Sequence, residues 1–307
     1  MIHTKYLIIG ASAAGISAAN NLAKLDPGSD ILVVGSEKVP PYNKCFLVDW
    51  LVGEKGYEQL ALKVDPRIKL IRDTKILKLD IANKVATLSD KQQVCYEKAL
   101  LAIGVRPFVP PIAGLKHAEH VFTFHDLLDT EKIQNFIKFF RPKNVVVIGA
   151  GLTGLECADA LWRLGLQVSI VECGPQLLGK LVDSAGAAFL KNHIEQLGVK
   201  IELNACVSEI DTQNIICDSG KILPADLIII ATGVRPNHLE IQGGELKYLD
   251  HYVSVDCHLQ TNLPDIWAAG DLIVVPDLLT GRPTPTCSWP DAMFQGNLAA
   301  ANMAGFA

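Results

Sequence analysis

Short apolar runs bounded by glycine recur along the chain and alternate with stretches of helical periodicity. In the first third of the sequence these runs cover residues 6–9, 30–34 and 99–103. Parallel strands are buried on both faces, so they appear in a sequence as continuous apolar runs. Between residues 68 and 96 apolar and polar positions alternate instead, with turn residues such as Asp80 and Asn83 between the segments. This part predicts an antiparallel meander, and the whole pattern predicts an α/β fold.

The same order of elements returns after residue 144. The pattern predicts strands at 144–148, 168–171 and 227–231, helices at 152–164 and about 184–197, and a hairpin at 200–223. The tetrapeptide Gly-Val-Arg-Pro closes the order in both halves. It begins 94 residues after Gly10 in the first half and 84 residues after Gly149 in the second. Such internal similarity indicates a duplicated unit.

The last segment belongs to neither copy. Residues 266–271 read Ile-Trp-Ala-Ala-Gly-Asp and predict a strand that ends in an acid, and residues 290–302 predict a helix of small residues. This strand needs a sheet, and the first half is its expected host. We therefore predict a discontinuous first domain of residues 1–110 and 240–307, with a second domain of residues 111–239 inserted into it.

Each half opens with a glycine-rich turn between a strand and a helix. The first turn reads Gly10-Ala-Ser12-Ala13-Ala14-Gly15, and the second reads Gly149-Ala-Gly151-Leu152-Thr153-Gly154. The first glycine allows a tight turn, and the free N–H groups at the helix start can bind a pyrophosphate. Ser12 replaces the usual middle glycine and is still small enough to let a phosphate approach. One such loop is weak evidence, but two predict two Rossmann-like dinucleotide sites and electron transfer between them.

An acid is expected at the end of the second strand, where it would accept hydrogen bonds from the adenosine ribose. In the first half the strand at 30–34 is followed by Gly35, Ser36 and Glu37. Spacing alone does not decide whether Ser36 or Glu37 takes this role.

Composition and charge exclude several classes of protein. The net charge of −5 over 307 residues provides no electrostatic footprint for nucleic acid or an anionic membrane. No apolar run approaches the roughly 20 residues that cross a bilayer, and the first strand begins too early to leave room for a signal peptide. The eight cysteines show no Cys-x-x-Cys spacing, and the eight histidines show no metal-ligand spacing. We expect a cytoplasmic protein with scattered thiols, without a redox disulfide or a metal site.

The chain resembles the FAD-dependent, pyridine-nucleotide-linked disulfide oxidoreductases over almost its whole length. The resemblance rests on the two glycine-rich turns, the Ala-Thr-Gly at 231–233 and the Ala-Gly-Asp at 269–271, in this order. Among branches of the family it is most similar to NADH oxidases, coenzyme A-disulfide reductases, rubredoxin and ferredoxin reductases, and the flavin module of nitrite reductase. The segment Pro-Tyr-Asn-Lys at 41–44 is similar to the Pro-Tyr-x-Arg of that branch. The resemblance implies a glutathione-reductase-like fold of two Rossmann-like domains that bind FAD and NAD(H).

The resemblance also implies roles for individual residues. Asp271 would bind the ribityl hydroxyls of FAD, and the segment from Trp289 into the last helix would lie beside the flavin pyrimidine, where a helix N-terminus stabilises negative charge. The implied FAD-binding residues are Gly10, Ser12, Ala13, Ala14, Gly15, Ser36, Glu37, Lys44, Ile76, Gly104, Asp271 and Trp289. The implied NAD-binding residues are Gly149, Gly151, Leu152, Thr153, Gly154, Glu172 and Gly233. Glu172 would bind the NADH ribose, and since a carboxylate repels a 2′-phosphate, NADH is favoured over NADPH. Glu156 would lie near the flavin and nicotinamide, with a first-turn helix acid as the alternative.

Several positions depart from the family pattern. Asp49 occupies the place of a lysine in the ferredoxin-reductase branch, so a pair of Asp49 with Glu156 cannot be that branch's ion pair. His125 replaces an arginine that often contacts FAD, and Ile103 replaces the threonine of the first Ala-Thr-Gly. The family continues for roughly 100 more residues that form a dimer interface, whereas this chain stops at Ala307. We expect either a truncated chain or a protein without that interface domain, which leaves a homodimer open.

Cys45 is the candidate redox thiol. It lies in the loop after the second strand, where the coenzyme A-disulfide and peroxide-reducing branch carries a single cysteine near the flavin. We expect Lys44 and a following helix at 46–51 to lower its pKa and favour the thiolate. The alternative is an inert, buried cysteine, as we expect for Cys157 and Cys173, and Cys287 is expected in the loop before the last helix.

The resulting hypothesis is an enzyme in which NADH delivers hydride to the flavin, which then passes electrons to an acceptor. The preferred acceptor is a small electron-carrier protein or a downstream redox centre, followed by a disulfide or peroxide reduced through Cys45, or oxygen. The alternative class is a non-catalytic signalling flavoprotein resembling apoptosis-inducing factor.

Overall fold

The chain passes back and forth between two units in the computed structural model, which describes residues 1–306. Unit 1 comprises Met1–Asn43, Leu60–Arg106 and Arg235–Ala307, and unit 2 comprises Lys44–Gln59 and Pro107–Val234. Ala307, the last residue of the predicted first domain, lies outside the described residues. Two of the four crossings between the units fall within the Gly-Val-Arg-Pro repeats, which contain strands β7 (Val105–Pro107) and β16 (Val234–Pro236), and the other two lie on either side of residues 44–59.

Strand β1 (Ile2–Ile9) is the centre of unit 1. It pairs in parallel with β2 (Ile31–Val34) on one side and with β6 (Gln93–Leu101) on the other. The sheet has the order β17-β4-β5-β6-β1-β2-β3, and β20 also pairs with β6. Burial of β1 and β2 on both faces explains the continuous apolar runs that predicted them.

The remaining elements of unit 1 are α1 (Ala13–Leu25), β3 (Lys69–Ile71), β4 (Ile76–Asp80), β5 (Val85–Leu88), β17 (Glu240–Gln242), β18 (Tyr248–Leu249), β19 (Tyr252–Ser254), β20 (Ile266–Ala268), β21 (Ile273–Pro276), β22 (Pro283–Thr284) and α7 (Trp289–Ala304). The last segment of the chain thus returns to the sheet of the first half, as its sequence predicted, because β20 adds to β6 in parallel.

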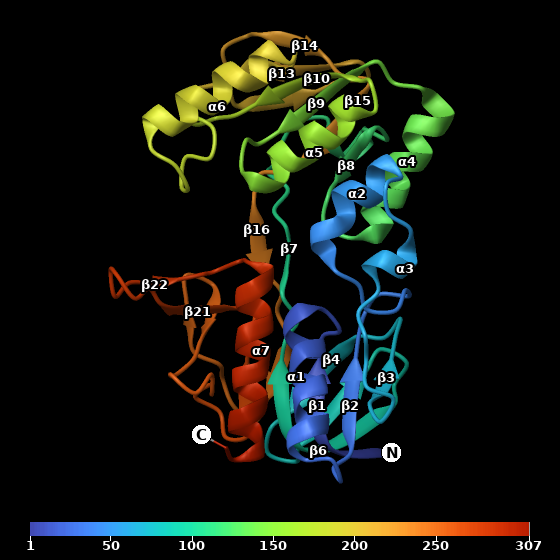
Figure 1. Ribbon diagram of the computed structural model, residues 1–307, viewed down its shortest axis with the longest axis vertical. Helices are drawn as coiled ribbons and strands as arrows, with labels where there is room; N and C mark the ends of the chain where they lie inside the picture. The colour runs from blue at the N-terminus through green and yellow to red at the C-terminus, as the bar shows by residue number, and fades with distance from the viewer. Residues whose placement is uncertain (307) are drawn as a thin grey trace. The chain divides into compact units, whose positions relative to one another are not determined.

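Helices α1 and α7 lie side by side in unit 1 (Figure 1). Their backbones come very close, since a Cβ atom on Gly296 would lie 2.2 Å from the Ala14 carbonyl oxygen. The Asn21 side chain also donates a hydrogen bond to the Asn297 carbonyl at 3.0 Å. Small residues on both helices permit this approach, which holds the middle of α7 beside the start of α1.

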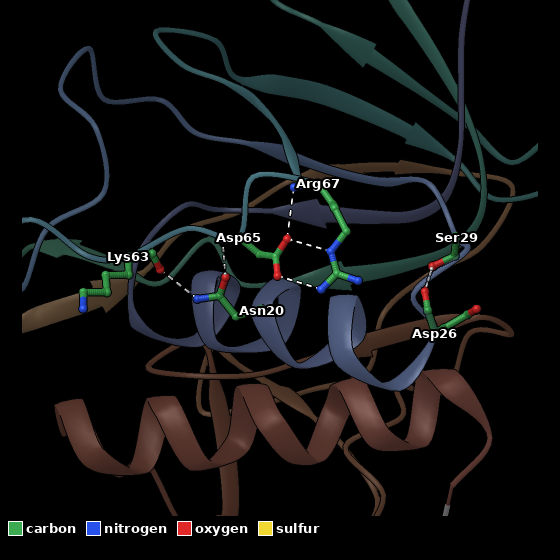
Figure 2. Close-up of polar contacts among 6 residues, drawn as sticks. All are labelled: Asn20, Asp26, Ser29, Lys63, Asp65 and Arg67. Atoms are coloured by element: carbon green, nitrogen blue, oxygen red, sulfur yellow. Dashed lines mark hydrogen bonds and ion pairs between the residues drawn. The ribbon is translucent and has the colours of Figure 1, made fainter.

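Helix α1 also anchors the chain that leads into β3 (Figure 2). The Asn20 side chain donates to the Lys63 carbonyl at 2.8 Å and accepts from the Asp65 N–H at 2.9 Å. The Arg67 side chain donates two hydrogen bonds to the Asp65 carboxylate, from Nε to Oδ1 at 2.8 Å and from Nη2 to Oδ2 at 2.7 Å. At the other end of α1 the Ser29 hydroxyl donates to the Asp26 carbonyl, which closes the turn into β2.

Strand β9 (Asn144–Ile148) has the same central place in unit 2. It lies between β10 (Gln167–Val171) and β15 (Leu227–Ile230), parallel to both, in a sheet of order β11-β10-β9-β15-β8. The other elements of the unit are η1 (Lys44–Phe46), α2 (Leu47–Val52), α3 (Tyr57–Leu60), η2 (Leu115–His117), β8 (Val121–Thr123), α4 (Leu127–Phe140), α5 (Leu152–Arg163), α6 (Ser184–Gln196), β11 (Lys200–Glu202), β12 (Val207–Ile210), β13 (Asn214–Cys217) and β14 (Ile222–Pro224). Strands β12, β13 and β14 form the antiparallel meander of this unit.

Residues 44–59 lie in unit 2, although we predicted them within the first domain. The short helix α2 buries Leu47 and Leu51, which are one turn apart and face α4 and α5. The Gln134 side chain donates to the Trp50 carbonyl at 2.7 Å, and Arg163 forms an ion pair with Glu54. The apolar face of α2 is therefore covered by helices of unit 2.

Candidate functional site

The first glycine-rich turn joins β1 to α1, and its shape requires glycine at two positions. Gly10 has φ of +118°, and a Cβ atom there would lie 2.0 Å from the Ala102 carbonyl oxygen. A Cβ atom on Gly15 would lie 1.9 Å from the Gly10 carbonyl oxygen. Ser12 is the N-cap residue of α1, and its hydroxyl makes no capping hydrogen bond within residues 1–306. The helix therefore begins tightly against the strand end, with its first N–H groups directed at the loop.

The second turn, between β9 and α5, repeats this construction. Gly149 has φ of +109°, with a Cβ position 2.4 Å from the Ala231 carbonyl oxygen, and the Cβ position of Gly154 lies 2.1 Å from the Gly149 carbonyl oxygen. A Cβ atom on Gly151 would meet no heavy atom of the described chain within 4 Å. A pyrophosphate bound above the N-terminus of α5 would need such open space. Leu152 and Thr153 form the exposed first turn of this helix.

Glu172 lies directly after β10 and faces this second turn. Its Oε2 accepts a hydrogen bond from the Ala150 N–H at 2.8 Å, and its Oε1 accepts one from the Gly174 N–H at 2.7 Å. Both carboxylate oxygens are thus held by main-chain donors at the edge of the glycine-rich turn. This is where an acid must lie to accept hydrogen bonds from an adenosine ribose, so the geometry fits the role expected of Glu172.

The corresponding acid of unit 1 lies further along the chain. The Gly10 N–H donates to the Val34 carbonyl, as the Gly149 N–H donates to the Val171 carbonyl, so Gly35 is the structural counterpart of Glu172. Ser36 is exposed and Glu37 is half-buried, with the Tyr42 hydroxyl donating to a Glu37 carboxylate oxygen at 2.7 Å. The ribose contact of unit 1 through Ser36 or Glu37 stays a prediction.

The end of β20 brings Asp271 to the same sheet edge as the first turn. The Ala269 N–H donates to the Leu101 carbonyl, and the Gly270 N–H donates to the Gln295 side chain at 2.8 Å. Gln295 is buried on α7, and sequence reasoning missed it. The signal that could have found it was an amide residue among the small, apolar positions of this helix, since a buried amide needs a partner.

The other predicted FAD residues of unit 1 are spread over several elements. Ile76 begins β4 and is buried, Gly104 follows β6, and Trp289 begins α7. The Asn237 side chain donates to the Ile103 carbonyl at 2.8 Å, and its N–H donates to the Gly104 carbonyl. In unit 2, Gly233 accepts a hydrogen bond from the Phe108 N–H. Lys44 belongs to unit 2, whereas all the other predicted FAD-binding residues belong to unit 1.

The expected low pKa of Cys45 is wrong for this structure. Cys45 is exposed and belongs to η1, which precedes α2. Partial burial of its thiol raises its pKa, and the negative charge of Glu156 raises it further. These effects outweigh the stabilising backbone hydrogen bond, so the thiolate is disfavoured. Glu156 on α5 itself has a raised pKa, because partial burial of its carboxyl disfavours the charged form.

The structure also shows what Asp49 does in place of the family's lysine. Its carboxylate forms an ion pair with Lys55 at 2.7 Å, and the Lys55 ammonium lies 3.9 Å from the centre of the Phe46 ring. Asp49 therefore acts within the 44–59 segment, and the family's lysine–glutamate ion pair has no counterpart at this position.

Two cysteines that we expected as separate thiols are joined. Cys173 and Cys206 form a disulfide with Cα atoms 4.5 Å apart, although 33 residues separate them in sequence. Cys173 is exposed, so the interpretation of it as a packing residue is also wrong. The absence of Cys-x-x-Cys spacing misled us because the two residues follow neighbouring strands, β10 and β11. Cys157 is fully buried and Cys287 directly precedes the N-cap residue of α7, as expected.

Cys287 lies within reach of the Asp271 charge. Burial of its thiol and, secondly, the negative charge of Asp271 raise the pKa of Cys287 to about 11. Within residues 1–306 no group of three or more His, Cys, Asp and Glu side chains is arranged to hold a metal ion. None of the helices described in this range has both the length and the apolar character needed to cross a membrane.

Comparison with known proteins gives matches over most of the chain. A model of the family described as "Pyridine nucleotide-disulphide oxidoreductase" matches residues 4–296. The NADH oxidase of Methanocaldococcus jannaschii is 31% identical in an alignment of 313 positions. The alignment covers 97% of this chain and 70% of that protein. The NADH-rubredoxin oxidoreductase of Clostridium acetobutylicum is 30% identical over 277 residues, which cover 89% of this chain and 69% of that protein.

The fold is also similar to that of a solved structure. The crystal structure of reduced Bacillus anthracis CoADR-RHD matches with a TM-score of 0.94 and 25% sequence identity, covering 100% of this chain. The chain spans 57% of the length of that solved chain. The predicted α/β architecture is therefore confirmed.

Proposed function

Because this chain belongs to the pyridine nucleotide-disulphide oxidoreductase family, we propose that it is an FAD-dependent NADH oxidoreductase that passes electrons on to an electron-carrier protein or a downstream redox centre. The family binds FAD and NAD(P)H, and its members are NAD(P)H-dependent flavin oxidoreductases. The observation that carries the proposal is the repeated turn: Gly10 and Gly149 have the same conformation and the same close approach to a neighbouring strand.

In this proposal unit 1 holds FAD. The first turn would bind the pyrophosphate through N–H groups of α1, and Ser36 or Glu37 would bind the adenosine ribose. Asp271 would bind the ribityl chain, with Gln295 holding the adjacent Gly270 N–H. When bound, FAD supplies the redox chemistry, while the chain positions it and sets its electrostatic surroundings.

Unit 2 would bind NADH, with the pyrophosphate above Gly151 and the adenosine ribose on Glu172. Two main-chain hydrogen bonds keep the Glu172 carboxylate at this position. Because a 2′-phosphate would meet a charge of the same sign there, we propose NADH as the preferred reductant.

The proposed acceptor is a small redox protein. One relative is named a NADH-rubredoxin oxidoreductase, which supports this class of acceptor. The route through Cys45, with a disulfide or peroxide as acceptor, ranks second. Cys45 is exposed, which favours this route, but its raised pKa leaves little nucleophilic thiolate near neutral pH.

Absorbance spectroscopy tests the core of the proposal. The purified protein should show a flavin spectrum, and one equivalent of NADH should bleach it faster than one equivalent of NADPH. A protein that stays colourless after incubation with FAD would refute the assignment.

Turnover then distinguishes the acceptors. Fast reoxidation by rubredoxin or ferredoxin that is unchanged in Cys45→Ser would support the carrier route. Loss of disulfide or peroxide turnover in Cys45→Ser, with NADH bleaching intact, would support the thiol route. Slow reoxidation by every acceptor would favour a signalling flavoprotein instead of an enzyme.

A further inference from the structure

The Cys173–Cys206 disulfide lies next to the residue expected to bind the NADH ribose. Cys173 directly follows Glu172 at the end of β10, and Cys206 directly precedes β12. The disulfide therefore joins the loop that carries Glu172 to the loop that follows β11. No other pair of cysteines within residues 1–306 forms a disulfide.

Main-chain hydrogen bonds connect these two loops to the Glu172 carboxylate. The Ala205 N–H donates to the Glu172 carbonyl at 3.0 Å, and the Asn204 N–H donates to the Gly174 carbonyl at 3.0 Å. The Gly174 N–H in turn donates to Glu172 Oε1 at 2.7 Å. The loop that contains Cys206 thus binds Gly174, and Gly174 binds the Glu172 carboxylate. The disulfide adds a covalent bond between the same two loops, next to Glu172.

The two sulfur atoms differ in their surroundings. Cys173 is exposed, so a thiol reagent can reach its sulfur, whereas Cys206 is half-buried. The backbone of Cys206 is held independently of the disulfide, because its N–H donates to the Asp218 carboxylate and its carbonyl accepts from the Asp218 N–H at 2.8 Å. When the disulfide opens, Cys206 stays anchored to the β13–β14 turn, and the loop with Cys173 and Gly174 gains freedom.

We propose that Cys173 and Cys206 form a reversible thiol–disulfide site, and that its redox state sets the affinity of unit 2 for its dinucleotide. This inference rests on the proposed role of Glu172 in binding NADH. A reversible pair also agrees with the expected reducing compartment, where disulfides are usually transient and redox-sensing.

The reaction is an exchange with a dithiol. A thiolate of the reductant attacks the exposed Cys173 sulfur, a mixed disulfide forms, and Cys206 leaves as a thiolate that takes up a proton. The second thiol of the reductant then attacks the mixed disulfide and releases Cys173. The protein disulfide gains two electrons and two protons, and the reductant loses the same number as it becomes a disulfide.

The oxidised form should bind the dinucleotide more tightly, because the closed disulfide holds the Glu172 carboxylate in place before the ligand arrives. After reduction the ligand must order the 173–174 loop itself. We expect the dissociation constant for NAD⁺ to rise about fivefold, the lower end of the usual range for coupling between two sites. Coupling is reciprocal, so saturating NAD⁺ should shift the thiol–disulfide equilibrium of the pair toward the disulfide by the same factor.

The test uses the flavin-loaded protein and NAD⁺, which leaves the flavin oxidised. Calorimetry gives the dissociation constant before and after treatment with dithiothreitol, and alkylation followed by mass spectrometry counts the free thiols at Cys173 and Cys206. Cys206→Ser should bind NAD⁺ about fivefold more weakly than the oxidised protein, at the strength of ordinary coupling, and should not respond to dithiothreitol. Cys257→Ser, which removes an exposed cysteine of unit 1, should respond as the unchanged protein does.

Equal dissociation constants in the oxidised and reduced protein would overturn the inference while leaving the proposed function intact. A pair that resists dithiothreitol in the folded protein would also overturn it. If neither form binds NAD⁺, the proposed function fails as well, and that outcome differs from the first because no heat of binding is seen in either state. The flavin spectrum and the melting temperature of Cys206→Ser show whether the variant folds.

Discussion

Replacing Glu172 by glutamine should weaken NADH binding and improve NADPH binding. The carboxylate accepts hydrogen bonds with both oxygens, from the Ala150 and Gly174 N–H groups. Glutamine has nearly the same size but only one acceptor oxygen and no charge. Its amide group cannot accept the second N–H, and a ribose hydroxyl would donate to a neutral oxygen instead of a charged one.

The size of the effect follows from these changes. A hydrogen bond to a charged group contributes roughly 1 to 1.5 kcal/mol more to binding than a hydrogen bond to a neutral group. NADH should therefore bind roughly tenfold more weakly to Glu172→Gln. For NADPH, two unit charges about 4 Å apart repel each other by ~1 kcal/mol in water and by ~4 kcal/mol at an effective dielectric constant of 20. Removing this repulsion should strengthen NADPH binding at least about fivefold.

Stopped-flow bleaching of the flavin at increasing NADH and NADPH concentrations measures both constants. Glu202→Gln is the matched control, because Glu202 ends the next strand and carries the same charge but pairs with Lys221 at 2.6 Å. The Glu202 carbonyl accepts the Glu172 N–H, and this main-chain bond survives the substitution. We expect both dissociation constants of the control to stay within about twofold. If Glu172→Gln leaves the preference for NADH unchanged, Glu172 does not face the ribose.

Three further substitutions test other parts of the structure. Gly10→Ala places a Cβ atom 2.0 Å from the Ala102 carbonyl oxygen in a backbone conformation that alanine avoids, so we expect loss of bound flavin and a lower melting temperature. Glu156→Gln removes a negative charge that raises the pKa of Cys45, so iodoacetamide should alkylate Cys45 faster near neutral pH, as mass spectrometry of the labelled peptide would show. Asp26→Asn should destabilise unit 1 at pH 7 by roughly 1 kcal/mol or less, measured by denaturant unfolding, because the Asp26 pKa is lowered by the Lys5 ammonium.

Each of these has a control. A Cβ atom on Gly28 would meet no atom within 4 Å, so the Gly28→Ala variant should keep its flavin. If the Gly10→Ala variant also keeps its flavin, the first prediction is wrong. The control for Cys45 is Glu58→Gln, in which iodoacetamide should alkylate Cys45 at the rate of the unchanged protein. If Glu156→Gln also shows that unchanged rate, the Glu156 charge does not affect the Cys45 thiol. The stabilisation by Asp26 exists above the pKa of the unfolded carboxyl, near 4, and is lost as the pH falls through its lowered folded pKa. The cost of Asp26→Asn should therefore disappear in strong acid, and a cost that persists there has another cause.

The glycine-rich turns could be predicted from sequence because their requirement is local. A positive φ and a carbonyl oxygen closer than 2.5 Å to the Cβ position leave only glycine at Gly10 and Gly149, so the residue type marks the place. The buried strands of both units could be predicted for a related reason, since burial on two faces leaves only apolar residues. Two predictions were wrong: β6 is a single strand from Gln93 to Leu101, where we predicted the alternating stretch to end at 96 and a separate run at 99–103. The hairpin predicted at 200–223 is also wrong, because β11 pairs in parallel with β10 and only β12, β13 and β14 are antiparallel. The continuity of β6 comes from its neighbours, because β1 pairs with it along almost its whole length, β5 pairs with its first residues and β20 with its last.

The features that sequence did not predict depend on contacts between distant residues. The helix at 47–52 has an apolar face, but nothing in its sequence states which unit covers that face. The pKa of Cys45 depends on burial of its thiol and on the charge of Glu156, and the disulfide depends on β10 and β11 ending side by side. Neither relation leaves a mark in the spacing of cysteines or charges, which is why the thiols were interpreted as independent.

The two glycine-rich turns also show how one backbone plan differs between the two units. In unit 2 the position after the second strand carries Glu172, whose side chain reaches the Ala150 N–H of the turn. In unit 1 the same position is Gly35, and a Cβ atom there would lie 2.7 Å from the Cβ of Ala11, the counterpart of Ala150. No side chain fits at Gly35, so the acid that we propose for the first ribose would come from a later residue. Ser36 and Glu37 are the next residues, and Tyr42 holds the Glu37 carboxylate from the following loop. The close approach of Ala11 to Gly35 thus leaves no room in unit 1 for a side chain at the position that Glu172 holds in unit 2, so the spacing in one half of the chain does not transfer to the other.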